Sequence, residues 1–277
     1  MKGKIALALI SVFLLYEVNP AHYHAASCND PLAESAGKWD YTYDGFYIGN
    51  NGCLYDPDIF AYTDIPPISS SNSSDEVVIY VNGANHRVDW VVPEMTAIAH
   101  KTHKQVISIY NSTAGGRFPD AITDSLFGSR SVDTVSKTIN EVYKNNQTVH
   151  FKANSQGAIH LMDGLKQNIA EFGERPEQLK LLKIETAGAA ESHYIDGPKY
   201  VHYVNKFDPV PRKVGVLAEG AQPGKLAKII MIGVKDMNPM ESKLRWIDPL
   251  TRNFFLTFHG FNAYHTKWQP FEFIYNN

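Results

Sequence analysis

Residues 149–158 read Val149-His150-Phe151-Lys152-Ala153-Asn154-Ser155-Gln156-Gly157-Ala158. This run is typical of a short strand that passes through a tight turn into the start of a helix. Ser155 stands at the apex of the turn, and small residues lie two positions on either side of it, where the backbone is crowded. Such a turn lifts the serine hydroxyl above the edge of a sheet and directs the next backbone N–H groups at the same point. We therefore expect other functional groups of the chain to converge on Ser155.

The pattern small-x-Ser-x-Gly matches the nucleophile-elbow signature, with Ala153 where the first glycine usually stands. A structural interpretation is open as well. Asn154 and Ser155 are favoured N-cap residues, and a helix with an apolar face begins here, so Ser155 alone would serve as a helix cap without any chemistry.

The composition fits one large globular α/β domain. The chain has 277 residues, of which 44% are hydrophobic and 20% are charged, which is enough apolar material for a sizeable core. The net charge of -3 gives no basic surface of the kind that nucleic acid requires, so nucleic acid is not an expected partner.

The N-terminus has the features of a secretory signal peptide. Lys2 and Lys4 precede the apolar run Ile5–Tyr16, and small residues follow. The run is shorter than the roughly 20 residues of a membrane-spanning helix. We expect residues 1–26 to be a signal peptide of a secreted or periplasmic protein; the alternative is an uncleaved segment that anchors the protein in the membrane.

Residues 27–75 lack sustained periodicity and predict an irregular N-terminal extension that ends in a Ser-rich linker, before the main domain at 76–277. The two cysteines, Cys28 and Cys53, both precede that domain. In an exported protein they suggest one disulfide that ties down the extension, whereas in the cytosol they would be two unrelated thiols.

Strands alternate with helices through the main domain, which predicts an α/β fold with a mostly parallel sheet and helices on both faces. Helices are expected over residues 89–103 and 131–143 and directly after Ser155. The first expected strand is the continuous apolar run at 77–81, and further strands are expected at 105–110, 149–154, 179–186, 200–205 and 227–234.

An acid and a histidine follow later strands, and sites in open α/β sheets lie beyond the carboxyl ends of the strands. Asp208 comes directly after the strand at 200–205, with Pro209 and Pro211 to stiffen its loop. By itself Asp208 also fits an ordinary Asp-Pro turn. His259 is the preferred histidine because Gly260 adjoins it in a loop, and His265 is the rival.

Ser155, Asp208 and His259 occur in the chain order nucleophile, acid, base that α/β-hydrolases use. Over roughly residues 77–265 the chain resembles the α/β-hydrolases, in particular the lipase-like branch that includes fungal-type triacylglycerol lipases and lipase-like effector hydrolases of bacteria. The resemblance is carried by three motifs, at 153–157, 205–211 (Asn-x-x-Asp-Pro-Val-Pro) and 259–264 (His-x-Phe-x-x-Tyr). The chain departs from the family pattern at Ala153, where a glycine is usual, and it lacks a His-Gly pair near Gly83.

The predicted chemistry is nucleophilic catalysis by serine. His259 would take the proton of Ser155, and Asp208 would orient the imidazole and stabilise its charged form. Backbone N–H groups of Gln156 and of the Gly83-Ala84 loop would meet the oxyanion. This chemistry requires no metal and no cofactor.

The expected substrate is a carboxylic ester of a lipid or another acyl group, which would bring a peripheral contact with a membrane. An apolar rim formed by residues 115–119 and the aromatic C-terminal region favours it, although those aromatics equally fit ordinary core packing. A thioesterase or peptidase would share the same three residues. A non-catalytic protein that binds an acyl ligand or a partner is a further alternative. A metal site at His86, His100 and His103 lacks a supporting motif.

Overall fold

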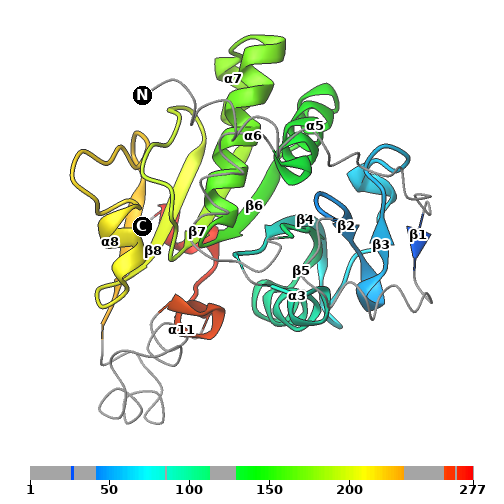
Figure 1. The fold of residues 1–277 in the computed structure, drawn as a ribbon, viewed down its shortest axis with the longest axis horizontal. Helices are drawn as coiled ribbons and strands as arrows, with labels where there is room; N and C mark the ends of the chain where they lie inside the picture. Colours follow the sequence, from blue (N-terminus) through cyan, green and yellow to red (C-terminus); the bar gives the residue numbers. More distant parts are fainter. Residues whose placement is uncertain are drawn as a thin grey trace, which may run out of the picture.

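The structure, a computed structural model, describes residues 26–27, 42–84, 86–112, 129–233, 259–265 and 267–276. Their strands form one nine-stranded sheet in the order β1-β3-β2-β5-β4-β6-β7-β8-β9 (Figure 1). Strands β4 to β9 pair parallel with one another, whereas β1, β2 and β3 pair antiparallel at one edge. The prediction of a mostly parallel sheet is confirmed. The strands are β1 (Ala26–Ser27), β2 (Tyr47–Ile48), β3 (Leu54–Tyr55), β4 (Ser74–Val81), β5 (Lys104–Ile109), β6 (Val149–Asn154), β7 (Leu182–Ala187), β8 (Lys199–Asn205) and β9 (Lys228–Ile232).

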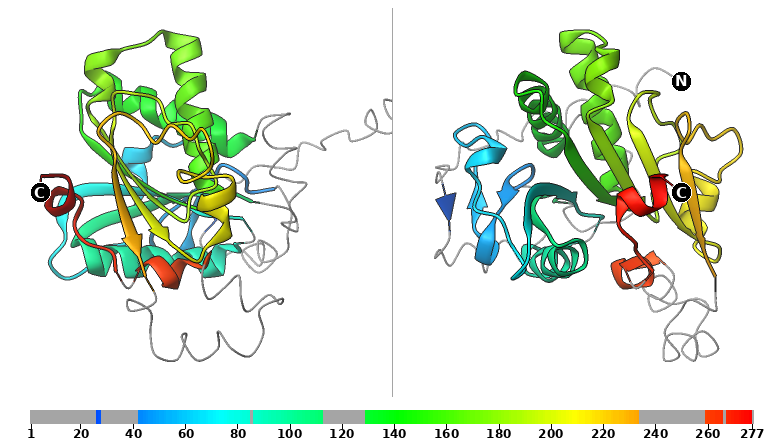
Figure 2. Two further views of the ribbon diagram at one scale, coloured as in Figure 1. Left: turned by 90° about the vertical axis from the view of Figure 1, so that its left-hand side faces the viewer. Right: turned by 180° about the vertical axis from the view of Figure 1, so that it is seen from behind.

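Helices cover both faces of the sheet, as predicted (Figure 2). Helices α5 and α6 pack together on one face, and α3 lies with α11 and α12 on the other. The α-helices are α3 (Val88–Thr102), α5 (Arg130–Lys144), α6 (Gly157–Phe172), α7 (Pro176–Leu179), α8 (Pro209–Lys213), α11 (Phe261–His265) and α12 (Phe271–Asn276). Two 3-10 turns, η2 (Asn50–Gly52) and η3 (Tyr62–Asp64), lie in the N-terminal part.

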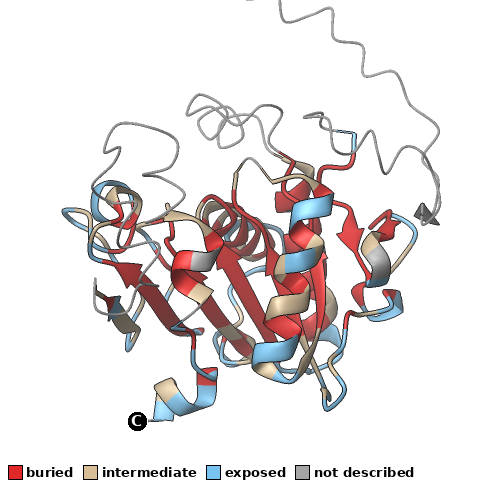
Figure 3. Cartoon of the chain, turned by 90° about the horizontal axis from the view of Figure 1, so that it is seen from below, coloured by how far each residue is buried: buried red, intermediate tan, exposed pale blue. Residues whose placement is uncertain are grey.

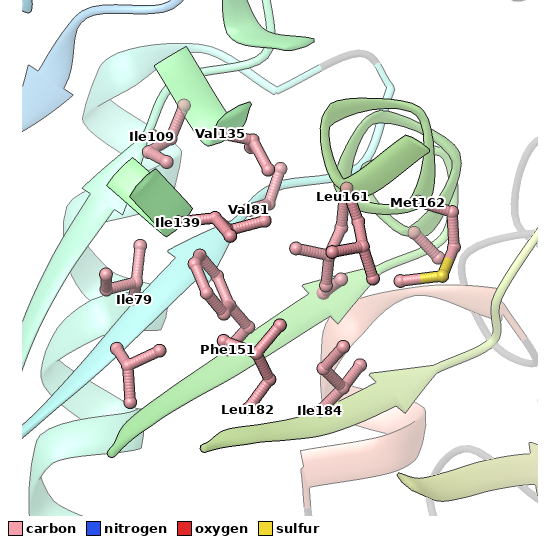
Figure 4. Packing of buried hydrophobic residues seen from close by; sticks show 14 of the residues in the cluster. Ile79, Val81, Ile109, Val135, Ile139, Phe151, Leu161, Met162, Leu182 and Ile184 are labelled. Atoms are coloured by element: carbon pink, nitrogen blue, oxygen red, sulfur yellow. The ribbon is translucent and has the colours of Figure 1, made fainter. Parts of the chain in front are cut away.

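The core explains why β4 carries a continuous apolar run over residues 77–81. In β4, Ile79 and Val81 pack with α5 and α6, whereas Val78 and Tyr80 pack with α3. Successive side chains of a strand point to opposite faces, and here both faces are covered, so no position is left for a polar, solvated residue. Figure 4 shows the first of these clusters, in which Phe151 of β6 lies between the strands and the two helices.

The element boundaries agree with the sequence prediction to within two residues, except at the starts of β4 and β7. Leu179, expected to open a strand, is the last residue of the short helix α7 and is buried in the core. β7 begins only at Leu182. An apolar run gives no sign of where a turn of helix ends and a buried strand begins, because both require the same residues.

The segment before the main domain differs from the expected irregular extension. Strands β2 and β3 continue the sheet beyond β5. The hydroxyl groups of Tyr47 in β2 and Thr138 in α5 form a hydrogen bond of 2.8 Å. The boundary expected between residues 75 and 76 falls inside β4, which begins at Ser74. The described residues 42–75 are therefore part of the same sheet as the rest of the domain.

The remaining N-terminal predictions lie largely outside the described residues. These include residues 1–25 of the expected signal peptide, and Cys28. Cys53 is buried and disulfide-bonded, and its pairing with Cys28 stays a prediction. None of the helices in the described part of the chain is both long and apolar enough to cross a membrane.

Several of the described C-terminal aromatic residues belong to the core, whereas Phe273 is exposed. Trp268 and Phe271 are 4% and 2% exposed and pack with Val201 and Tyr203 of β8. Figure 3 shows the buried strands between the partly exposed helices. Helix α12 is tied to the sheet by Lys183, whose ammonium group contacts Glu272 at 2.5 Å and Glu76 at 3.0 Å. The expected rim at residues 115–119 lies outside the described residues.

Candidate active site

The turn between β6 and α6 places Ser155 in left-handed backbone. Its φ is +51°, a conformation that costs a non-glycine residue roughly 1–3 kcal/mol. Gly157 makes the turn sterically feasible, because a Cβ at that position would lie 2.4 Å from the carbonyl oxygen of Val81. The turn is held from the neighbouring strand as well: the Ser155 N–H donates to the Ala187 carbonyl at 3.0 Å. Ala153 is fully buried and does not prevent this geometry.

The three residues singled out by chain order lie together in a hydrogen-bonded series. Ser155 Oγ lies 2.6 Å from Nε2 of His259. Nδ1 of His259 lies 2.7 Å from Oδ2 of Asp208. The hydroxyl can donate to Nε2 while the carboxylate accepts from Nδ1–H, which is the neutral tautomer that a general base requires.

Asp208 is fully buried and each of its carboxylate oxygens has a donor. As N-cap of α8, it accepts the Val210 N–H on Oδ1 at 2.9 Å. Oδ2 accepts the Tyr264 hydroxyl at 2.5 Å in addition to His259. The Asn205 N–H donates to the Tyr264 oxygen at 3.2 Å, so the tyrosine joins the acid to the end of β8.

Burial, together with the Asp208 carboxylate, raises the pKa of Tyr264 above its ordinary value, so the phenol stays protonated and donates. Gly188 gives this group its room, since a Cβ there would lie 2.9 Å from the Tyr264 ring and 3.1 Å from Asp208 Oδ2. The site thus depends on a glycine that adjoins β7, with φ of +59°.

The predicted oxyanion donors lie on both sides of Ser155. Gln156 follows it directly and is buried, with its side-chain carbonyl accepting from Asn111 at 3.3 Å. Gly83 faces Ser155 closely: a Cβ on Gly83 would lie 3.0 Å from the Ser155 Cβ. Ala84 continues the same loop after β4.

His265 takes no part in this series. It lies on α11 with its ring stacked on Phe261 at a centroid distance of 4.9 Å. Burial and nearby lysines lower its pKa to about 4, so it is neutral. His259 is the histidine that reaches Ser155.

The three histidines considered for a metal do not form a cluster. His100 and His103 are exposed at the C-terminal end of α3, whereas His86 precedes that helix and contacts Glu94 at 2.9 Å. Among the residues that the structure describes, no group of three or more His, Cys, Asp or Glu side chains is arranged to hold a metal ion.

Two interactions of the site were not predicted from the sequence. Tyr264 appeared only as part of a motif, without a role, and the contact between His86 and Glu94 was not foreseen. Glu94 faces the loop after β4 from the partly buried side of α3. The sequence signal for the contact of Glu94 with His86 is a charged residue on an otherwise apolar helix face, because a buried charge needs a partner.

No protein-family model matches the sequence. No curated protein matches it significantly. Among solved structures, the chain is similar to an esterase of Pyrobaculum calidifontis, at 11% identity and a TM-score of 0.43, over 84% of this chain and 86% of that one. It is similar to EstE1, a thermostable carboxylesterase cloned from a metagenomic library, at 12% identity and a TM-score of 0.41, over 86% and 94%. It is also similar to XC6422 from Xanthomonas campestris, described as an α/β serine hydrolase without a lid, at 10% identity and a TM-score of 0.36, over 68% and 82%.

The chain's own topology defines its fold. A serine in left-handed backbone follows β6, an acid follows β8, and a histidine further along the chain joins them. They meet beyond the carboxyl ends of a mostly parallel sheet that has helices on both faces. This arrangement, in the chain order serine, acid, histidine, is that of the α/β-hydrolases. The protein has an α/β-hydrolase fold.

Proposed function

We propose that this protein is an exported serine hydrolase that cleaves a carboxylic ester, of a lipid or another acyl substrate, through an acyl-enzyme. The observation that carries the proposal is the series Ser155–His259–Asp208, with distances of 2.6 and 2.7 Å. A strained serine that touches a histidine, which in turn touches a buried acid, is the arrangement that activates a hydroxyl nucleophile.

In the first half-reaction, Ser155 Oγ attacks the carbonyl carbon of the ester while Nε2 of His259 takes the hydroxyl proton. The carbonyl oxygen becomes an oxyanion, for which backbone N–H groups of Gln156 and of the Gly83-Ala84 loop are the proposed donors. When the intermediate collapses, the bond from carbon to the alkoxy oxygen breaks. The leaving alcohol receives the proton from His259, and the acyl group remains on Ser155.

In the second half-reaction, water attacks the acyl carbon and gives a proton to His259. The bond to Ser155 Oγ breaks, His259 returns the proton to that oxygen, and the carboxylic acid leaves. Asp208 holds Nδ1–H throughout and stabilises the imidazolium that forms twice in each cycle. The solved structures named above include esterases, which favours an ester over an amide.

Export is part of the proposal and rests on the sequence alone. Lys2 and Lys4, followed by the apolar run at 5–16, favour removal of residues 1–26 on secretion. A lipid substrate would bring a peripheral contact with a membrane.

Fluorophosphonate labelling, read by intact mass, tests the nucleophile. The protein should gain one adduct and Ser155→Ala none, with ester hydrolysis by the variant lower by roughly 10⁵-fold or more. Ser192→Ala is the matched control: Ser192 Oγ also lies 2.8 Å from a histidine, Nδ1 of His193, but at an exposed place. This control should label like the parent.

No adduct on the folded parent, with or without detergent, or an adduct that persists in Ser155→Ala, would contradict the proposal. Hydrolysis rates for matched esters, thioesters and amides then separate an esterase from a thioesterase or peptidase. After expression in a secreting host, the same intact mass also reports whether residues 1–26 have been removed.

A further inference from the structure

A second histidine, His86, contacts the Gly83-Ala84 loop that abuts Ser155, and its ring nitrogens face acceptors. Nδ1 of His86 lies 3.1 Å from the Gly83 carbonyl oxygen and 2.9 Å from that of Ala84. Its Nε2 lies 2.9 Å from Oε1 of Glu94. The other carboxylate oxygen of Glu94 accepts the Tyr80 hydroxyl at 2.7 Å.

These contacts determine the protonation of the ring. A neutral imidazole has one N–H, and its other nitrogen carries a lone pair that would face an oxygen lone pair. Because carbonyl oxygens meet Nδ1 and the carboxylate of Glu94 meets Nε2, both nitrogens donate when Glu94 is ionised, and His86 is then an imidazolium. Burial by itself would lower the pKa of His86, but Glu94 and the two carbonyls raise it overall.

The two carbonyls belong to the loop that abuts Ser155. The Gly83 carbonyl shares a planar trans peptide with the Ala84 N–H, so the two point in opposite directions. Fixing that oxygen on His86 turns the Ala84 N–H away from His86. The Asn82 side chain donates to the same oxygen at 2.9 Å, which limits rotation of this peptide further.

We propose that His86, held by Glu94, is a positioning residue for ester hydrolysis: its doubly protonated ring fixes the Gly83-Ala84 peptide so that the amide of Ala84 faces the developing oxyanion. This inference rests on the proposed function. When the ring loses one proton, the charged Glu94 retains the one on Nε2, so Nδ1 no longer donates to the Gly83 and Ala84 carbonyls and His86 no longer holds the peptide. Activity should then fall on the alkaline side, independently of His259, whose protonation governs the acid side.

The surroundings of His86 support this assignment. The side chains of His86 and Glu94 are only 17% and 13% exposed, so solvent screens their attraction weakly. From β4, Tyr80 faces Glu94, and the Tyr110 hydroxyl donates to the His86 carbonyl at 2.9 Å. Arg87 and Asp89 pair with each other in the next turn and are both largely exposed.

The test is the pH profile of ester hydrolysis for the parent and Glu94→Gln, between about pH 5.5 and 10. The amide still accepts a hydrogen bond from His86 but carries no charge. We expect the pH at which kcat falls on the alkaline side to be lower in Glu94→Gln by about 1–3 pH units. The KM and the pH at which kcat falls on the acid side should not change. Asp89→Asn, which removes an exposed carboxylate in the adjacent turn, is the matched control and should leave both pH values unchanged.

A second readout does not depend on activity. The ring resonances of His86, assigned by their absence in His86→Gln, should titrate above the ordinary histidine range in the parent and at lower pH in Glu94→Gln. A loss of activity in Glu94→Gln that is equal at every pH would indicate a structural role only and overturn the inference. An active parent whose alkaline limb Glu94→Gln leaves unchanged would overturn it as well.

The two proposals fail in distinguishable ways. A folded parent that neither hydrolyses esters nor takes a fluorophosphonate adduct overturns the proposed function, and with it the role of His86. A parent that labels at Ser155 and hydrolyses esters, but whose His86 titrates below the ordinary histidine range, overturns only the inference about His86.

Discussion

Two groups that meet the Ser155 turn, the His259 side and the His86 side, carry the same three kinds of residue in the same order. On one side, Tyr264 donates to Asp208, and Asp208 contacts His259. On the other, Tyr80 donates to Glu94, and Glu94 contacts His86. The two histidines differ in the partner of the second ring nitrogen, which is the Ser155 hydroxyl for His259 and two backbone carbonyls for His86.

This difference assigns opposite chemistry to two similar groups. A hydroxyl can donate, so His259 can stay neutral and accept the serine proton. Carbonyls can only accept, so Nδ1 of His86 donates, and with an ionised Glu94 at Nε2 the ring keeps both protons. A carboxylate beside a histidine therefore does not by itself define a catalytic base, and the group on the far nitrogen decides between a base and a cation.

The largest expected effect comes from neutralising the acid on the His259 side. In Asp208→Asn the amide can donate to Nδ1, which favours the wrong tautomer and leaves Nε2 unable to accept the proton of Ser155. We expect kcat to fall by about 10⁴-fold at neutral pH. Steady-state ester hydrolysis measures this, with Asp163→Asn, a half-buried carboxylate on α6, as the control. A fall of less than tenfold would show that the two sides do not differ as described.

A smaller loss of kcat is expected from removing the hydroxyl of either tyrosine, and its size should differ between Tyr264 and Tyr80. Tyr264→Phe removes a donor from Asp208 and leaves the N–H of Asn205 buried without its acceptor, which should lower the unfolding free energy by about 1–3 kcal/mol and kcat by about tenfold. Tyr80→Phe removes the matching donor from Glu94. We expect a comparable loss of stability there but a smaller loss of kcat at neutral pH.

Urea unfolding and kcat, measured on both tyrosine variants, make this comparison. Equal losses of kcat in the two would argue that the hydroxyls serve packing alone, and that the acid on the His259 side has no special need of its donor.

The smallest expected effect is the contribution of His86 to stability. Its pKa is raised above the ordinary histidine value of 6.5, so the folded state holds the proton more tightly than the unfolded state. The resulting stability is fully present below about pH 6.5 and is lost as the pH rises through the raised value. It amounts to about 1.4 kcal/mol for each pH unit of the shift.

The difference in unfolding free energy between the parent and His86→Gln, measured from pH 5 to 9.5, should therefore shrink on the alkaline side. A difference that grows with pH would mean that His86 is held neutral, contrary to its contacts.

The sequence predicted the parallel part of the sheet and the three residues that meet at Ser155. The buried part of β4 leaves a continuous apolar run, and the serine turn and the acid each directly follow a strand. The roles of Ser155, Asp208 and His259 remain proposals that labelling and kinetics test.

Other features left no such signal. β2 and β3 contain two residues each, too few for any periodicity, so their pairing at the edge of the sheet was missed. The contacts of Tyr264 with Asp208 and of His86 with Glu94 depend on how loops and helices meet in three dimensions. A side chain whose partner is set by tertiary packing cannot be recognised from local spacing.

The backbone at Ser155 has a wider meaning for this protein. Glycine adopts left-handed backbone without strain, so the fold alone would favour glycine at the apex of the turn. A serine there makes every folded molecule less stable than its own architecture allows, with or without substrate. At this position the hydroxyl and the highest stability are mutually exclusive, which is the trade-off between activity and stability at the scale of a single residue.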